Sequence, residues 1–180
     1  IIILILAIGS CVKAPSQFYD SLSDTRRIPM ADQMLFLKAI AHQKKGQIEP
    51  AIGLWEKFLE KHPKSYEAIN NLGFLYYAND QIAQAILQFE QGLKLESGSA
   101  KIKDNLLRAL KVKVSILEEN KEYDEAIINL KRISQLSSLE EQEKIDRQAE
   151  SFEDKIFKQV KNSNLSEEYH RFLEKYPNSP

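Results

Sequence analysis

The sequence predicts an all-α protein in which helical hairpins stack in a row. Apolar residues recur at intervals of three and four along most of the chain, which is the spacing of one helix face. One helix pair recurs along the chain, with Ala51 of one copy equivalent to Ala85 of the next. The composition includes only six glycines and six prolines in 180 residues, with abundant Lys, Glu, Leu, Ile and Ala, which favours long helices.

The clearest helix pair lies within residues 65–95. Its first helix places apolar and small residues at i, i+3, i+4 and i+7, namely Ile69, Leu72, Gly73 and Tyr76. Its second helix places Ala85, Phe89 and Leu93 at i, i+4 and i+8. Because Gly73 and Ala85 are small, we expect the two helices to approach closely, with the larger side chains filling the space around them. Asn79 and Asp80 provide the polar turn between the helices.

This spacing, I-x2-L-G-x2-Y followed by A-x3-F, resembles the tetratricopeptide repeat (TPR), with Ile69 where that family prefers Trp. The resemblance implies TPR-type hairpins stacked as an α-solenoid, with a concave surface lined mainly by the first helix of each pair.

Further copies surround the clearest pair, which we assign to residues 66–99. A preceding copy occupies residues 32–65, and we call the step from Ala51 to Ala85 the repeat step. Gly46 lies in the turn of this copy, where a left-handed residue is favoured, and Pro50 lies at the start of its second helix. A third copy occupies residues 100–138, with Ala126 aligned to Ala85. Because this second step exceeds the repeat step by seven positions, the first helix of the third copy is predicted to be two turns longer, from about residue 100 to 119.

Residues 139–180 are predicted to form a degenerate helix pair or C-terminal cap. The segment FLEKYPNS at 172–179 repeats FLEKHPKS at 58–65. A long helix from about Leu139 precedes it, opened by the capping box Ser138-x-x-Glu141. These elongated helices distinguish the C-terminal half of the solenoid.

Charge and cysteine content exclude several classes of function. Lys and Arg number 25 against 26 Asp and Glu, so no general basic surface for nucleic acid is expected. A single cysteine excludes an internal disulfide framework and a cysteine-based zinc site. We predict no cofactor.

The N-terminal residues IIILILAIGS, followed directly by Cys11, differ from the rest of the chain. Eight apolar residues are too few to span a bilayer, which takes about 20. They have the proportions of the apolar part of a signal peptide, so residues 1–10 are interpreted as the end of one. Ile8 to Cys11 resembles a bacterial lipobox, which implies a lipid on Cys11. A truncated transmembrane helix and a buried apolar segment are the alternatives.

The lipobox resemblance implies a location in the bacterial cell envelope, anchored to a membrane and facing the periplasm rather than the cytoplasm. The absence of Asp after Cys11 favours the outer membrane. Residues 11–31 are predicted to be a tether. Alternatively, Phe18, Tyr19 and Leu22 form a short helix that caps the first repeat.

Catalytic motifs are not recognised in the sequence, and we predict that the protein is not an enzyme. His42 takes the Tyr position of the first repeat, where packing is its expected role. Glu167, His170 and Glu174 share a helix face with metal-ligand spacing, but charged residues on a solvated helix commonly do so. We predict no metal site.

Binding is therefore the expected function, at the groove positions that the TPR resemblance implies. The first repeat contributes Phe36, Ile40 and Gln43, the second Asn70, Phe74 and Tyr77, and the third Arg108 and Lys111. An aromatic patch beside amide and basic side chains would suit a peptide segment. Alternatively, the long C-terminal helices fold back and bury this patch.

We expect a non-catalytic, membrane-anchored scaffold or adaptor that binds another envelope protein. The alternative is an accessory ligand-binding lipoprotein of a solute transport system, which requires an enclosed apolar cavity. An uncapped end of the helix stack offers a surface for self-association.

Overall fold

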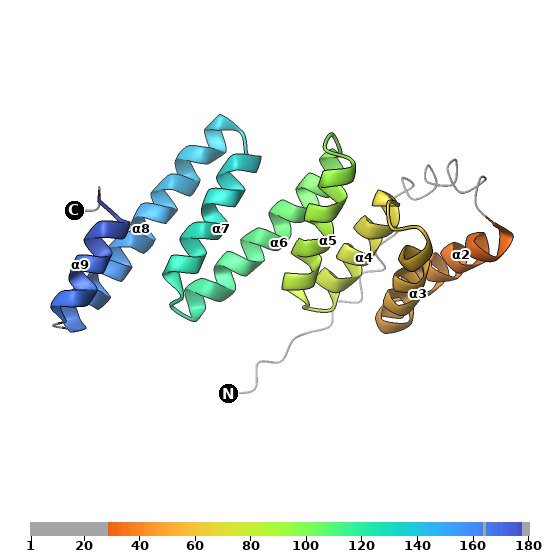
Figure 1. The fold of residues 1–180 in the computed structure, drawn as a ribbon, viewed down its shortest axis with the longest axis horizontal. Helices are drawn as coiled ribbons and strands as arrows, with labels where there is room; N and C mark the ends of the chain where they lie inside the picture. Colours follow the sequence, from red (N-terminus) through yellow and green to blue (C-terminus); the bar gives the residue numbers. More distant parts are fainter. Residues whose placement is uncertain (1–28, 164, 178–180) are drawn as a thin grey trace.

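The computed structural model describes residues 29–163 and 165–177, and these residues form an α-solenoid of TPR-type hairpins (Figure 1). The helices in chain order are α2 (Met30–Lys44), α3 (Ile48–Lys61), α4 (Tyr66–Ala78), α5 (Ile82–Leu95), α6 (Ala100–Glu119), α7 (Tyr123–Leu136), α8 (Leu139–Ser163) and α9 (Ser166–Lys175). Each helix packs against the next one in sequence, so the molecule is elongated, with α2 and α9 at opposite ends. The described part of the chain contains no strand.

Glycine at position 73 allows the close approach of α4 and α5 that the sequence predicts. A Cβ atom on Gly73 would lie 2.7 Å from Cε1 of Phe89, which is closer than carbon atoms pack. Ala85 on α5 is fully buried, and Leu72 and Phe89 are buried beside it. The small residues therefore set the distance between these two helices.

The turns inside the first three hairpins share one backbone conformation. Gly46, Asp80 and Lys121 all have positive φ, at +70°, +57° and +63°. The amide of the residue after each of them donates a hydrogen bond to a carbonyl five residues back, over 3.0, 2.9 and 2.8 Å. This is the six-to-one hydrogen bond of the Schellman motif, which closes the C-terminus of a helix. The prediction of a left-handed cap at Gly46 is confirmed.

The long helix α6 has the bounds that the sequence predicts. Its apolar residues stay on one side through the two additional turns, and the buried ones are Ile102, Leu106, Ala109, Leu110, Val114 and Leu117. Its first half contacts α5, where Ile102 lies against Gly92, and its end leads directly into the turn to α7. Ser99 caps α6 by accepting a hydrogen bond from the amide of Ile102 over 3.3 Å.

The C-terminal helices α8 and α9 complete the stack. α8 begins at Leu139, as predicted, and Glu141 accepts a hydrogen bond from the Ser138 amide over 3.4 Å. This is one half of a capping box; the Ser138 hydroxyl also donates to Glu141 instead of accepting from an amide. α8 packs against α7 through Phe152 and Tyr123, whose ring centroids are 5.6 Å apart.

Two hydrophobic clusters make up the core. The N-terminal cluster joins α2, α3 and α4, and the C-terminal cluster runs from α5 to α9. Tyr76 of α4 packs against both clusters and so connects them. Among the described helices, none combines the length and apolar character needed to cross a bilayer.

The N-terminal predictions fall largely outside the described residues. The signal segment, Cys11 and the capping residues Phe18, Tyr19 and Leu22 all lie there. Helix α2 begins at Met30, so the last two residues of the predicted tether belong to this helix. The Pro29 carbonyl accepts hydrogen bonds from the amides of Asp32 and Gln33, which starts the helix at that point.

Candidate functional site

Helices α4 and α6 are joined side by side by a pair of asparagines. Asn105 of α6 donates a hydrogen bond through Nδ2 to Oδ1 of Asn70 on α4, over 2.9 Å. Asn70 is buried, with 4% of its surface exposed, and Asn105 is half-buried. The pair thus fixes the spacing and register of the first helices of two consecutive hairpins, which are the helices expected to line the concave surface.

The surface that continues from this pair combines aromatic and cationic side chains. One helical turn beyond Asn70 lies Phe74, which is 45% exposed, and one turn beyond Asn105 lies Arg108, which is exposed. The following turns carry Tyr77, which is half-buried against the C-terminal cluster, and Lys111, which is exposed. We call this surface the α4–α6 strip, defined by Asn70, Phe74, Tyr77, Asn105, Arg108 and Lys111.

The positions of Arg108 and Lys111 follow from the repeat in two ways. In the first alignment, the regular repeat continues into α6, and Arg108 and Lys111 stand one repeat step after Phe74 and Tyr77. In the second alignment, Ala126 is matched to Ala85, and Arg108 and Lys111 again fall at groove positions of the third repeat. The two alignments differ by seven positions, which is close to two helical turns, so they indicate the same face of α6.

Basic residues outnumber acidic residues along the exposed first three turns of α6. Lys101, Lys103, Arg108 and Lys111 are exposed there, against one exposed carboxylate, Asp104. A local excess of positive charge attracts acidic ligands, most strongly at low ionic strength. The α4–α6 strip therefore suits a segment that combines an apolar side chain with acidic neighbours.

The prediction that Phe36 lines an open groove is wrong. Phe36 is buried, with 1% of its surface exposed, and its ring centroid lies 4.9 Å from that of Trp55 and 5.3 Å from that of Phe58. Phe58 occupies a place on α3 where the closely packed second hairpin has Gly92. The three rings pack in T-shaped pairs, with the edge of one ring against the face of another. Burying the Phe36 ring contributes about 2–3 kcal/mol.

Two further predicted groove residues take part in the packing of α2. Ile40 is half-buried against the N-terminal cluster. Gln43 is half-buried, and its Oε1 accepts a hydrogen bond from Nε1 of Trp55 over 3.2 Å. Both side chains therefore hold α2 on α3, and the α4–α6 strip is the more accessible part of the predicted groove.

Asn105 was missed by the sequence prediction. It stands one repeat step after Asn71, which is buried and is not a groove position. The groove residue Asn70 has Asp104 as its counterpart, so the repeat gave no signal for Asn105. The prediction aligned the third repeat from its second helix, and this alignment omits the first two turns of α6.

His62 and His42 are both half-buried in the helix packing. His62 Nε2 lies 3.1 Å from Oδ2 of Asp32, and Lys61 Nζ lies 2.6 Å from Oδ1 of the same carboxylate. The hydrogen bond from Lys61, with a further one from His62, lowers the pKa of Asp32 against the opposing effect of burial. His42 is half-buried, and its Nδ1 is buried without a hydrogen-bond partner among the described residues.

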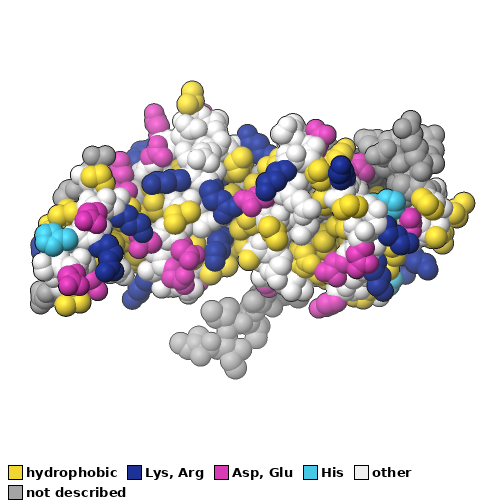
Figure 2. Space-filling model, in the orientation of Figure 1, with side chains coloured by type: hydrophobic (Ala, Val, Ile, Leu, Met, Phe, Trp, Pro, Cys, Tyr) yellow, Lys and Arg dark blue, Asp and Glu magenta, His cyan; other side chains and the backbone are white. Residues whose placement is uncertain are grey.

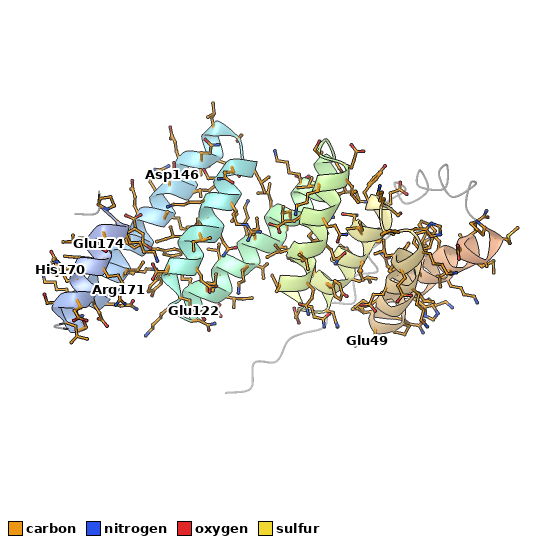
Figure 3. All side chains as sticks on the ribbon, in the orientation of Figure 1. Glu49, Glu122, Asp146, His170, Arg171 and Glu174 are labelled. Carbon is orange, nitrogen blue, oxygen red and sulfur yellow. The ribbon has the colours of Figure 1, made fainter. Side chains whose placement is uncertain are left out.

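The third histidine, His170, is exposed on α9 together with Glu174, and Figure 3 shows both at the end of the molecule opposite α2. Within residues 29–163 and 165–177, no group of three or more His, Cys, Asp or Glu side chains is arranged to hold a metal ion.

Open hollows lie between helices on the surface of the described solenoid. A hollow of about 430 Å³ separates α5 from α7, with Leu106 and Leu110 of α6 at its floor. The ion pair between Glu90 and Arg132 bridges its rim. A hollow of about 300 Å³ lies between α8 and α9, beside Asp124. Both hollows open to solvent and differ from the enclosed apolar cavity that capture of a small solute requires.

Comparison with protein families assigns the N-terminal hairpins. Residues 33–65 and residues 54–87 each match a family model described as "Tetratricopeptide repeat". The matched part of the chain covers α2, α3, α4 and the start of α5, so its sequence is similar to tetratricopeptide repeats.

Comparison with individual proteins adds little. No curated protein matches the chain. Among solved structures, the chain is similar to "First TPR of Spaghetti (RPAP3) bound to HSP90 peptide SRMEEVD", with 19% identity and a TM-score of 0.43. That similarity covers 64% of this chain and 93% of the other.

Proposed function

We propose that this protein is a non-catalytic interaction module that binds a peptide segment of another protein on the α4–α6 strip. The observation that carries the proposal is the exposed Phe74 ring beside the cationic side of α6, above a hydrogen-bonded asparagine pair. Exposed aromatic and Arg side chains are the types that contribute most binding energy at protein interfaces. The similarity of residues 33–87 to tetratricopeptide repeats supports a role in protein–protein interaction.

The rigid packing below the strip favours binding without a large ordering cost. Asn70 is held by Asn105, and Tyr77 packs against the C-terminal cluster, so a partner meets side chains that are already positioned. The strip presents one apolar contact and two cations within about three helical turns. We propose a partner segment with an apolar side chain near acidic residues, in an extended or helical conformation.

We further propose that the module is tethered to a membrane of the bacterial envelope by lipid on Cys11. The lipobox-like sequence Ile8 to Cys11 supports this part of the proposal. Attachment through more than one acyl chain gives stable anchoring, since each buried CH₂ group contributes about 0.8 kcal/mol. The repeats would then act as an adaptor that holds an envelope protein near the membrane.

The experiment is a cross-linking pull-down from membranes that compares the wild type with the double variant Phe74→Ala/Tyr77→Ala. A protein partner recovered with the wild type is expected to fall at least tenfold with the double variant, because an aromatic anchor contributes about 2 kcal/mol or more. A Leu87→Ala variant is the matched control, since Leu87 is 61% exposed on α5, a helix that contributes no residue to the strip. Helicity of all variants is checked by circular dichroism.

A partner list that is unchanged in the double variant contradicts the assignment of the strip. A small molecule that co-purifies in place of a protein supports the solute-transport alternative. Cys11→Ser tests the tether separately: the variant is expected to leave the membrane fraction, and its retention there would contradict lipid anchoring.

A further inference from the structure

The end of the solenoid formed by α2 carries an uncovered apolar stripe. Met30, Met34 and Leu37 are 73%, 48% and 47% exposed, and their spacing of i, i+4 and i+7 places them on one face of the helix. The exposed Ala41 continues this face by one turn. Figure 2 shows hydrophobic atoms projecting at this end of the molecule. An apolar stripe of this kind normally lies against another helix.

The internal repeat indicates what type of helix fits this stripe. One repeat step takes Met34, Leu37 and Ala41 of α2 to Ala68, Asn71 and Leu75 of α4. All three counterparts are buried, and two of them, Ala68 and Leu75, belong to the N-terminal cluster that includes Trp55 and Phe58 of α3. The stripe is therefore the face that α4 uses to pack against α3. A helix that resembles α3 is the expected partner.

Helix α9 resembles α3 in sequence and in its terminal geometry. The segment FLEKYP, which begins at Phe172 in α9, repeats FLEKHP, which begins at Phe58 in α3. His62 ends α3 with φ −126° and ψ 61°, and Tyr176 ends α9 with φ −129° and ψ 67°. In each helix the amide of this residue donates to the carbonyl of the phenylalanine four residues earlier, over 2.9 Å.

Helix α9 also leaves a face uncovered at the opposite end of the solenoid. Leu165, Tyr169 and Leu173 lie at i, i+4 and i+8 and are 56%, 39% and 39% exposed, although one side of the Tyr169 ring lies against Phe157 of α8, with 6.1 Å between the ring centroids. The alignment of Phe172 with Phe58 places them at the positions of Ala51, Trp55 and Leu59. Ala51 and Trp55 are fully buried in the N-terminal cluster, to which α4 contributes. Trp55 also packs on Phe36 of its own hairpin, just as Tyr169 packs on Phe157. Leu165 and Leu173 are therefore the exposed residues of this face that a helix like α4 would cover.

We propose that α9 of one copy docks against α2 of a second copy, so that the packing of α3 on α4 is repeated between two molecules. Opposite charges support this antiparallel pairing. The first turn of α9 carries Glu167 and Glu168, and it would lie beside the exposed Lys45 at the end of α2. Because the described residues leave one apolar face exposed on α2 and another on α9, the contact joins copies head to tail into chains or closed rings.

This inference is independent of the α4–α6 strip, and the test does not require the partner of that strip. The mass of the purified 180-residue chain is measured by light scattering and sedimentation over a range of concentrations. The wild type is expected to assemble as concentration rises. Leu37→Glu and Leu173→Glu are each expected to abolish assembly, with helicity unchanged, because both side chains are partly exposed. Leu87→Glu, which alters an exposed leucine of α5, is expected to assemble like the wild type.

Mixing the two defective variants gives the most specific result. Leu37→Glu retains an intact α9 face, and Leu173→Glu retains an intact α2 face. Their mixture is therefore expected to form a one-to-one dimer that does not grow further. A wild type that stays monomeric overturns the proposal. This holds also if the cause is another segment of the same chain that covers α2. Assembly that survives either substitution, or a mixture that stays monomeric, also overturns it.

Discussion

At the scale of single residues, the segments FLEKHP at 58–63 and FLEKYP at 172–177 each bind an aspartate through the lysine and the residue that follows it. Lys61 and His62 bind Asp32 in the first hairpin. At the other end, Lys175 Nζ lies 2.6 Å from Oδ1 of Asp124, and the Tyr176 hydroxyl donates to the same oxygen over 2.5 Å. The repeated FLEK motif was recognised in the sequence, but these contacts were not predictable. The two aspartates lie 29 and 51 residues from the lysines that bind them and belong to no common pattern.

The pairing of Asp32 predicts how stability depends on pH. The hydrogen bond from Lys61 lowers the pKa of this carboxyl in the folded state, so the unfolded chain binds its proton at higher pH. The stabilisation is therefore complete above the unfolded pKa of about 4 and is lost as the pH falls through the folded pKa. Asp32→Asn is expected to lower the melting temperature at pH 7, and its difference from the wild type is expected to shrink below about pH 4.

The matched control for this prediction is Asp146→Asn. Asp146 is exposed on α8, and Figure 3 shows it in the half of the molecule opposite α2, the helix that carries Asp32. Its replacement is expected to change the melting temperature little at any pH. Thermal unfolding followed by circular dichroism at several pH values provides the comparison. A difference between Asp32→Asn and the wild type that persists undiminished at pH 2 would show that the carboxylate charge is not the cause.

At the scale of helices and turns, the sequence predicted where elements begin and end better than how they are rotated. The bounds of α6 were predicted, because the spacing of apolar residues marks both its length and its buried side. The rotation of α2 about its own axis was not predicted. It depends on how Phe36 packs with Trp55 and Phe58, and a repeat pattern does not contain that information. Groove positions assigned from the pattern therefore failed at Phe36 and suited α4 and α6 better.

The equivalent turns at Gly46, Asp80 and Lys121 permit a prediction about turn chemistry. Lys121 adopts a left-handed conformation that disfavours residues with a Cβ atom. Lys121→Gly is therefore expected to stabilise the protein by about 0.5–1 kcal/mol. Gly46→Ala is expected to destabilise it by about 1 kcal/mol. Urea denaturation measures both changes.

The Gly46→Ala variant isolates the backbone effect. No atom lies within 4 Å of the position that its new Cβ would occupy, so steric contact with neighbouring elements does not contribute. If both substitutions shift stability in the same direction, turn conformation is not the determining factor.

At the scale of the whole molecule, the core is distributed along a line instead of around one centre. The N-terminal and C-terminal clusters meet through Tyr76, and each helix packs chiefly on its sequence neighbours. In such a repeat architecture stability is approximately the sum of local terms and interfaces between neighbours. A substitution in one cluster is therefore expected to weaken nearby helices more than distant ones.

Trp55→Ala tests this distribution. Trp55 is fully buried, and its loss is expected to cost the N-terminal helices about 3–5 kcal/mol. Hydrogen exchange measured by mass spectrometry is expected to show faster exchange in α2, α3 and α4, with α7 and α8 little changed. Ile133→Ala, in the core of α7, is expected to give the reverse pattern. Uniform loss of protection in both variants would indicate a single cooperative core.

The two additional turns of α6 have a consequence for the amino-acid sequence of any partner that extends beyond the α4–α6 strip. The step from Ala85 to Ala126 exceeds the repeat step by seven positions, which lengthens the path along α6 by about 10 Å. An extended peptide advances about 3.3 Å per residue, so about three more of its residues are needed to cover this longer step. A linear motif that contacts both halves of the solenoid would therefore contain two short anchor sequences separated by a spacer, and the length of that spacer would be restricted more strictly than its composition.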